Sequence, residues 1–219
     1  MSRKDALIDA ALGHAPFDGF SQATIDTASA EIGMSAEEAK ALLPRGPADL
    51  ALAYHRRGDM LMVELLRAED LSAMRFRDRI AHAVRLRLEV AERELVRRGF
   101  SLFALPQHAA TGSRALWETA DQIWTTLGDT SRDINWYTKR ATLSAVYSAT
   151  ALYWLGDESI GYQKTWEFLD RRIENVMQFE KVKAQAKDNP LGRAFMAGPG
   201  KVFDFVRAPQ TGQYTGHGK

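Results

Sequence analysis

Helical periodicity runs through nearly the whole sequence, and no segment shows the alternation of apolar and polar residues that is typical of a half-buried β-strand. Apolar residues recur at three- and four-residue steps over residues 3–14, 22–32, 47–68, 75–98, 113–127, 131–156 and 162–181. Ser35, followed by Glu38 three places later, predicts a capping box that begins a further short helix. Gly99 is expected to end the helix over 75–98, with a loop over 99–112. The sequence therefore predicts an all-α protein.

Composition narrows the function classes. The 219 residues suffice for one sizeable core, and 29 basic against 28 acidic residues leave almost no net charge, which argues against a surface built for nucleic acid. Cysteine is absent, so disulfides and thiolate chemistry are excluded. The apolar-rich stretch 141–156 is too short to span a bilayer, and the first residues read as an amphipathic helix instead of an export signal. We therefore expect a cytoplasmic protein whose contact with the inner membrane is peripheral.

The chain divides into three parts by pattern. Residues 1–68 form a head of short helices, and residues 69–181 form a longer helical domain. Residues 180–190 are charged and poor in apolar side chains, which favours a linker, so residues 182–219 are predicted to be a linker followed by an amphipathic C-terminal helix.

The predicted head resembles the helix-turn-helix head of TetR-type regulators, with Gly33, Met34 and Ser35 between its second and third helices. In such heads the third helix enters the major groove of DNA. Here that helix reads SAEEAKALL, with two glutamates, one lysine and no arginine, whereas DNA binders gain most affinity from basic residues. A structural head without nucleic acid fits better, and a ligand-responsive DNA-binding regulator of TetR type is the alternative function.

The helix over 131–156 has two apolar sides. One side is small and aliphatic, and the other carries Trp136, Leu143, Tyr147 and Trp154 with Arg140 among them. A helix needs only one apolar side to pack into a core. The second apolar side therefore predicts a further contact with another helix, a second subunit, a lipid or a partner protein. The preceding helix repeats this pattern with Trp117, Asp121 and Trp124, unless all these aromatic residues are ordinary core.

No pattern in the sequence favours catalysis. The five histidines, His14, His55, His82, His108 and His217, lack metal-binding spacing. Asp157 and Glu158 follow a glycine in a turn and are expected to be solvated, as are the arginines of the helix over 75–98. No phosphate-binding glycine loop or nucleophile elbow occurs. We expect a non-enzyme without cofactor or metal.

A resemblance to a known family is concentrated in residues 128–177, GDTSRDINWYTKRATLSAVYSATALYWLGDESIGYQKTWEFLDRRIENVM. This segment closely resembles the signature region of the lipid-binding accessory protein family of ubiquinone (coenzyme Q) biosynthesis. The resemblance rests on the D-x-N-W-Y-T-[KR]-R core and the downstream T-W-x-F-L-x-x-R, with LWETADQIWTTLGD upstream. It implies a TetR-like helical bundle, usually a homodimer, with a cavity for an isoprenoid quinone precursor or a phospholipid. It also implies delivery of that lipid to a membrane-associated di-iron hydroxylase.

The resemblance also implies particular site residues. The family's surface for the hydroxylase falls here on Asp121, Trp124, Asp133, Trp136, Tyr137 and Arg140. Asp133 is further expected to stabilise a helix start, where a carboxylate faces the positive end of the dipole. The small residues Ala141, Ala145, Ser148 and Ala149 leave room for a cavity, and helix phase suggests as its walls Leu116, Ile123, Leu143, Tyr147, Trp166 and Leu169.

Members of this family carry a C-terminal amphipathic helix that binds membranes. Here the corresponding segment is interrupted by Gly198, Pro199 and Gly200, which shortens it. The predicted membrane-binding residues are Lys201, Val202, Phe203, Phe205, Val206 and Arg207. A short apolar side with a basic margin suits weak, reversible attachment to an anionic bilayer. The alternative is that this helix folds back onto its own domain.

Overall fold

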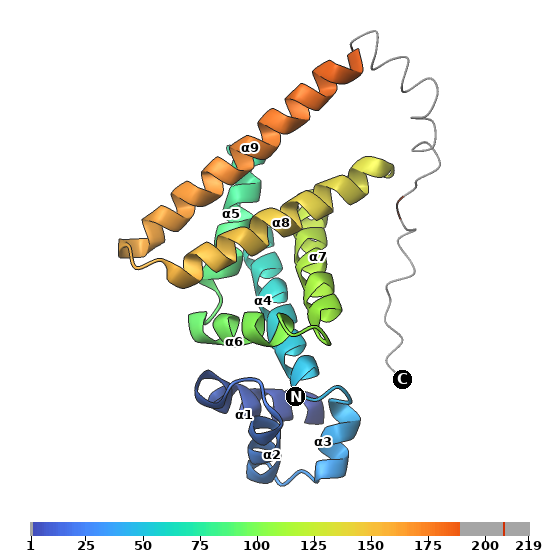
Figure 1. Ribbon diagram of the computed structural model, residues 1–219, viewed down its shortest axis with the longest axis vertical. Helices are drawn as coiled ribbons and strands as arrows, with labels where there is room; N and C mark the ends of the chain where they lie inside the picture. Colours follow the sequence, from blue (N-terminus) through green and yellow to red (C-terminus); the bar gives the residue numbers. More distant parts are fainter. Residues whose placement is uncertain (1, 189–207, 209–219) are drawn as a thin grey trace.

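The computed structural model describes residues 2–188 and Ala208, and over these residues the chain forms helices and no β-strand. The predicted all-α class is confirmed (Figure 1). The elements are α1 (Arg3–Asp18), α2 (Gln22–Glu31), α3 (Ala36–Leu42), α4 (Pro47–Ala68), α5 (Phe76–Glu89), α6 (Arg93–Phe103), α7 (Ala109–Thr126), α8 (Ile134–Gly156), a single 3-10 turn η1 (Ile160–Tyr162) and α9 (Gln163–Asp188).

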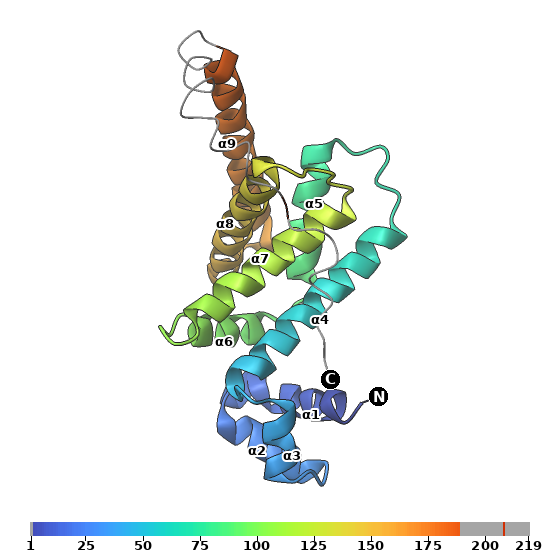
Figure 2. The same ribbon diagram turned by 90° about the vertical axis from the view of Figure 1, so that its right-hand side faces the viewer.

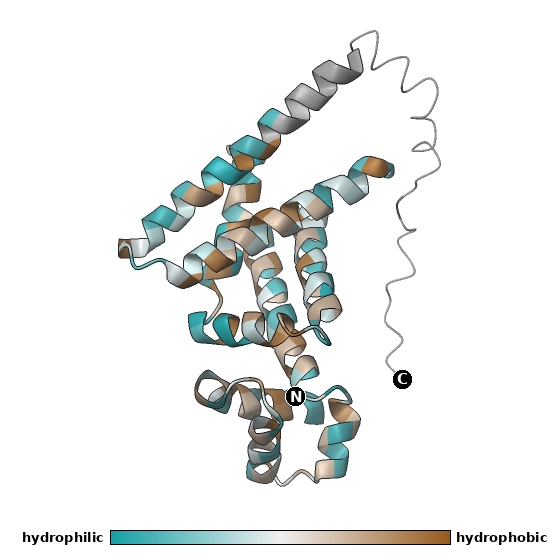
Figure 3. Cartoon of the chain, in the orientation of Figure 1, coloured by the Kyte–Doolittle hydropathy of each residue, from teal (hydrophilic) through white to brown (hydrophobic). Residues whose placement is uncertain are grey.

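Helix α4 connects two groups of helices. Helices α1 to α3 form a head at one end, and α4 rises from the head into a body formed with α5 to α9 (Figures 1 and 2). In the body α7 packs against α4 and α8, while α9 packs against α8 and α5. Teal and brown residues alternate along α6 and the described part of α9, as expected for helices that bury one side (Figure 3).

Each group of helices has its own apolar core. The head core gathers residues of α1 to α3 with Leu50 and Ala51 of α4 and Leu95 of α6. The body core gathers residues of α5, α7, α8 and α9 with Met62 and Val63 of α4. Because α4 contributes its first half to one core and its second half to the other, it holds the two groups together.

Side-chain caps mark several helix starts. At α3 the Ser35 hydroxyl accepts a hydrogen bond from the backbone N–H of Glu38, which is the first half of the predicted capping box. The second half is wrong, since the Glu38 carboxylate accepts two hydrogen bonds of 2.8 Å from the guanidinium of Arg3. The full capping box lies at α1, between Ser2 and Asp5.

The single helix predicted over 75–98 is wrong, because the chain breaks into α5 and α6 at residues 90–92. The break is held by Tyr54 of α4, whose hydroxyl accepts from the backbone N–H of Glu92 at 2.8 Å and donates to its carbonyl at 3.3 Å. Residues 90–92 contain neither glycine nor proline, so the local sequence does not predict this turn.

The loop predicted over 99–112 is largely helical. Helix α6 continues to Phe103, and α7 begins at Ala109, so Gly99 and Gly112 both lie inside helices. A Cβ at Gly112 would lie 2.7 Å from the Cβ of Phe103, so this glycine permits close packing of α7 on α6. Likewise α9 continues to Asp188 through residues that we expected to form a linker.

Asp157 is buried, which corrects the expectation of a solvated loop carboxylate. Its Oδ2 accepts hydrogen bonds from the backbone N–H and the hydroxyl of Thr165, at 2.9 and 2.6 Å, and its Oδ1 accepts from the N–H of Ser159. Burial acts to raise the pKa of Asp157, yet these hydrogen bonds outweigh it and hold the pKa well below the ordinary value. The residue thus fixes the turn between α8 and α9.

No helix among residues 2–188 is both long enough and apolar enough to cross a membrane. The predicted membrane-binding residues, Lys201, Val202, Phe203, Phe205, Val206 and Arg207, lie outside the described residues.

Candidate lipid-binding cavity and docking surface

A cavity of about 580 Å³ lies between α4, α6, α7 and α8. Its volume falls in the range of about 300–1,000 Å³ that is usual for small-molecule sites. Apolar side chains make most of its wall, including Leu95, Phe100, Phe103 and Leu116. The described helices therefore enclose a space that could hold an apolar guest.

The residues that line the cavity range from exposed to buried. The exposed ones include Ser101, Ala104, Ser113 and Leu152. The buried ones include Arg87, Leu95, Ala115 and Tyr147.

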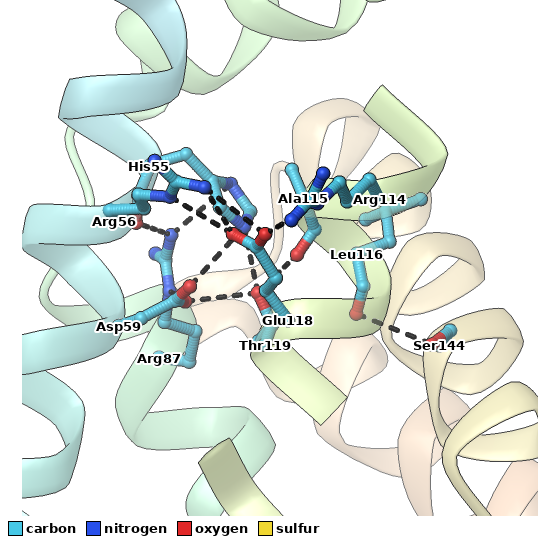
Figure 4. A network of polar contacts seen from close by, with 10 residues as sticks. All are labelled: His55, Arg56, Asp59, Arg87, Arg114, Ala115, Leu116, Glu118, Thr119 and Ser144. Carbon is cyan, nitrogen blue, oxygen red and sulfur yellow. Dashed lines mark hydrogen bonds and ion pairs between the residues drawn. The ribbon is translucent and has the colours of Figure 1, made fainter. Parts of the chain in front are cut away.

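Polar side chains of α4, α5 and α7 form a network (Figure 4), and two of its members, His55 and Arg87, line the cavity. Arg87 Nε donates to Asp59 Oδ1 at 2.6 Å, and Arg87 Nη2 donates to the carbonyl oxygen of His55 at 2.8 Å. The hydroxyl of Thr119 donates to Asp59 Oδ1 at 2.9 Å and lies 2.7 Å from His55 Nε2. We call these four residues, His55, Asp59, Arg87 and Thr119, the buried polar cluster.

The charges of the buried polar cluster cancel. Arg87 is 2 % exposed and ion-paired to Asp59, which corrects our expectation that the arginines of this segment are solvated. Burial lowers the pKa of His55, because the imidazolium form is poorly solvated there, so the ring is neutral at neutral pH. No local pattern predicted this cluster, since Asp59 and Arg87 lie 28 positions apart.

A second cavity of about 370 Å³ lies between α5, α7, α8 and α9. Its wall includes Phe76, Ile80, Trp124, Leu143 and Ile173. It is smaller than the first cavity, and the buried polar cluster does not line it.

The six residues predicted to line a lipid site do not lie together in the structure. Leu116 and Tyr147 line the larger cavity, and Leu143 lines the smaller one. Ile123 and Leu169 are fully buried in the body core and line neither cavity. Trp166 is partly buried, with the guanidinium of Arg85 4.9 Å from its ring centroid.

The small residues of α8 are also divided. Ser148 lines the larger cavity, as does the neighbouring Leu152. Ala141 and Ala145 are exposed, so they leave no room inside the protein. The larger cavity lies instead where residues of α6 face residues of α4, α7 and α8.

Trp117, Trp136 and Tyr137 pack together on α7 and the start of α8. The ring centroids of Trp117 and Trp136 are 5.7 Å apart, and those of Trp136 and Tyr137 are 4.8 Å apart. All three side chains are partly exposed, and we call them the aromatic face. Trp136 and Tyr137 belong to the predicted docking residues, whereas Trp117 joins them only through the fold.

The other predicted docking residues differ in exposure. Asp133 is exposed and accepts from the N–H of Asn135 at the start of α8, so its predicted capping role is confirmed. Arg140 and Trp124 are buried, which does not suit direct contact with a partner. Arg140 pairs with Asp121 and Asp129, and its guanidinium lies 4.1 Å from the Trp136 ring centroid, so it supports the aromatic face from beneath.

Asp129 anchors the loop before α8. Its carboxylate accepts from Lys139 Nζ at 2.7 Å, from the Ser131 hydroxyl at 2.8 Å and from Arg140 Nη1 at 3.0 Å. Burial acts to raise the pKa of Asp129, but the hydrogen bonds from Lys139, Ser131 and Arg140 outweigh it and lower the pKa to about 2.

Two further observations bear on function. Among the described residues, no group of three or more His, Asp or Glu side chains is placed to hold a metal ion. In α3, Glu37 is exposed and Glu38 is partly exposed, and the basic Arg3 is engaged with Glu38. This charge distribution does not favour contact with DNA phosphates.

Comparison with known proteins gives a consistent result. Residues 109–180 match the COQ9 family. The chain is 30 % identical over 187 residues to the mitochondrial ubiquinone biosynthesis protein COQ9 of Drosophila melanogaster, covering 83 % of this chain and 57 % of that protein. The COQ9 proteins of Rattus norvegicus and Homo sapiens are 29 % and 28 % identical, each over 88 % of this chain. This chain spans 64 % and 62 % of their lengths.

The fold is also found in a solved structure. The crystal structure of the TetR transcriptional regulator from Nitrosomonas europaea superposes with a TM-score of 0.60 at 19 % identity. The match covers 78 % of this chain and 95 % of the regulator. The predicted TetR-like architecture is therefore confirmed.

Proposed function

Because residues 109–180 match the COQ9 family and most of the chain is similar to COQ9 proteins, we propose that it is a non-catalytic, lipid-binding accessory protein of ubiquinone biosynthesis. In this proposal it binds an isoprenoid quinone precursor and presents it to a membrane-associated hydroxylase. The observation that carries the proposal is the apolar cavity of about 580 Å³ between α4, α6, α7 and α8.

Transfer energies explain why such a protein is useful. Exposing a polyprenyl tail to water costs about 0.8 kcal/mol for each CH₂-sized group, so a long tail keeps the molecule in the membrane. A cavity lined by Leu95, Phe100, Phe103 and Leu116 offers an apolar environment outside the bilayer. Taking up part of the lipid there lowers the barrier to moving its head group into an enzyme.

The aromatic face supports the proposed contact with the hydroxylase. Partly exposed tryptophan and tyrosine side chains are enriched at interface hot spots, because they bury a large area at low entropic cost. Trp117, Trp136 and Tyr137 provide this chemistry next to the exposed carboxylate of Asp133. We assign the docking surface to these residues, with Arg140 in a supporting position.

A homodimer and a peripheral membrane contact complete the proposal. The exposed side of α8, with Ala141, Ala145 and Leu152, suits contact with a second copy of the chain. Two copies would double the number of weak membrane attachments, which strengthens binding to a bilayer.

The test is a search for bound lipid with a cavity-filling variant. Protein purified under native conditions from a membrane-rich preparation is expected to carry isoprenoid lipid or phospholipid, detected by mass spectrometry. Ser148→Trp places an indole at the partly buried cavity wall and is expected to lower the bound lipid at least fivefold. Gln122→Trp is the control, because Gln122 is exposed on α7, another helix of the cavity wall, and does not itself line the cavity.

The two variants separate the outcomes. Loss of lipid in Ser148→Trp alone, with unchanged circular dichroism, supports a guest in the larger cavity. Wild-type protein without lipid in repeated native mass spectra would remove the proposed function. Equal occupancy in both variants would place the lipid elsewhere.

A further inference from the structure

We propose that α6 is a hinged wall of the larger cavity, held closed by hydrogen bonds to the head and to α8, and that a guest enters the cavity when α6 moves away from α7 and α8. The inference rests on the proposed function, because it names the route by which the lipid reaches its site. Three features of α6 carry it: its place in the cavity wall, its sparse burial, and the arginine side chains that fasten it to two other helices.

Helix α6 lies between the head and the body and packs on both (Figures 1 and 2). Leu95 is part of the head core, and Leu102 and Phe103 pack against that core while partly exposed. Among the described residues, α6 also contributes more of the lining of the larger cavity than any other helix. Because α7 packs directly on α4 and α8, a displacement of α6 would open the cavity without separating those three helices.

Few apolar contacts hold α6 in place. The structure describes every residue of α6, and of these only Leu95 is buried, whereas α7 and α8 each bury several residues. Elements with few buried apolar contacts open locally at a lower free energy than the core of a protein. Short non-helical connections flank α6 at residues 90–92 and 104–108, and they allow the helix to pivot.

Arg98 fastens α6 to the head. Its Nη2 donates to the carbonyl oxygens of Pro16 and Phe17, at 3.3 and 3.1 Å, in the last turn of α1. The last carbonyls of a helix have no partner within that helix and lie at the negative end of its dipole, so a guanidinium stabilises them.

Two further arginines fasten α6 to the end of α8. Arg93 Nη2 donates to the carbonyl oxygens of Leu155 and Asp157, both at 2.8 Å, and Arg97 Nη2 donates to that of Leu155 at 3.1 Å. The side chains of Arg97 and Arg98 are 50 % and 41 % exposed. Water therefore competes for their donors, and these hydrogen bonds can break without leaving a charge buried.

The contact with α1 gives the head a role that needs no nucleic acid. Arg98 does not line the cavity, and its two acceptors belong to the head. The head thus controls how readily the wall opens, while the residues of the cavity wall decide what is bound.

The first experiment measures opening without a guest. Arg98→Met keeps a long side chain but removes the donors to the head. Hydrogen exchange of the full chain, followed by mass spectrometry, is expected to be about two- to tenfold faster over residues 93–103 in this variant, with α7 and α8 unchanged. Arg98→Gln retains an amide donor and is expected to lie between wild type and Arg98→Met.

The second experiment measures entry, with the uncharged apolar dye Nile red as the guest. In stopped-flow fluorescence, Arg98→Met is expected to speed both uptake and release of the dye about threefold or more, with the dissociation constant changed by less than about twofold. A variant that only loosened the cavity would weaken binding instead. Arg114→Met is the matched control, because Arg114 is 67 % exposed on α7, pairs with Glu118 and does not line the cavity.

The outcomes distinguish this inference from the proposed function. Wild-type exchange over residues 93–103 in Arg98→Met would refute the hinge while lipid binding stands, since hydrogen exchange needs no guest. Faster exchange with unchanged dye kinetics would refute α6 as the entry route. Faster exchange throughout the chain would also overturn the proposal, because Arg98 would then support the whole fold. If wild-type protein takes up no dye, the entry route is overturned, and native mass spectra without lipid would remove the proposed function as well.

Discussion

Asp129 shows how one carboxylate organises the approach to the aromatic face. It binds Lys139 and Arg140, which lie 10 and 11 positions further along the chain. Arg140 in turn supports the ring of Trp136. The surface that we assign to docking therefore depends on a residue that lies beneath it.

The pKa of Asp129 predicts a defined pH dependence. Its pKa is about 2 in the folded protein and near 3.8 when unfolded, so its contribution is complete above about pH 4 and is lost as pH falls toward 2. Asp129→Asn is expected to lower the free energy of unfolding by about 1–2 kcal/mol at pH 6, with a smaller difference from wild type at pH 3. Urea unfolding at both pH values measures this.

Asp121→Asn is the matched control for Asp129. Asp121 also pairs with Arg140, but its side chain is 40 % exposed, so solvent screens the interaction and the expected loss is smaller. A difference between wild type and Asp129→Asn that does not shrink on acidification would contradict the assignment.

At the scale of elements, α4 depends on a glycine where it meets α5. The guanidinium of Arg87 lies so close to Gly58 that a Cβ there would be 2.6 Å from its Cζ atom. Arg87 cannot easily move, because Asp59 and the carbonyl of His55 both hold it. The close packing of α4 on α5 and the buried polar cluster are therefore one structural feature.

Gly58→Ala is expected to destabilise the protein by about 1–3 kcal/mol, even though alanine favours a helix by about 1 kcal/mol. The displaced guanidinium would lose part of its pairing with Asp59. Gly13→Ala in α1 is the control, because no atom lies within 4 Å of the added Cβ, and a gain of about 0.5–1 kcal/mol is expected. Thermal unfolding of both variants checks the prediction, and equal stabilisation would refute it.

At the scale of the whole molecule, α7 and α8 join the two proposed sites. Leu116 lines the larger cavity, and the next residue, Trp117, belongs to the aromatic face. On α8 the aromatic face lies near the start, at Trp136 and Tyr137, while Tyr147 and Leu152 line the cavity further along. A partner bound at one site would thus contact the helices that form the other.

Trp136→Lys is expected to weaken binding to the proposed hydroxylase partner by at least tenfold in a pull-down assay. The side chain is partly exposed, so the helical circular dichroism signal should be preserved. Phe17→Lys is the control, because Phe17 is 82 % exposed on α1 in the head, away from α7 and α8 (Figure 1). Unchanged capture by Trp136→Lys would exclude the aromatic face as the docking surface.

Local signals predicted much of the fold. The bounds predicted for α4, 47–68, agree with the structure, since a proline at its start and an apolar periodicity both act within a few residues. The Asp133 cap was predictable for the same reason, because its acceptor and donor lie two positions apart. Likewise, the resemblance of residues 128–177 predicted the family match, which covers residues 109–180 of this chain.

The structure was needed wherever a distant partner decides the environment of a side chain. In the sequence, Arg87 and Arg140 look like ordinary charged residues of a helix. Both can be buried because they pair with Asp59, Asp121 and Asp129. The break between α5 and α6 depends on Tyr54, which lies 38 positions from Glu92.

The sequence by itself determined that the chain is helical, where most of its helices begin, and which family it resembles, because periodicity, caps and motifs are local. Only the tertiary structure decided where the helices leave a cavity and which charges are buried beside it. Both depend on side chains far apart in the chain, whose contacts exist only once α4, α6, α7 and α8 have packed.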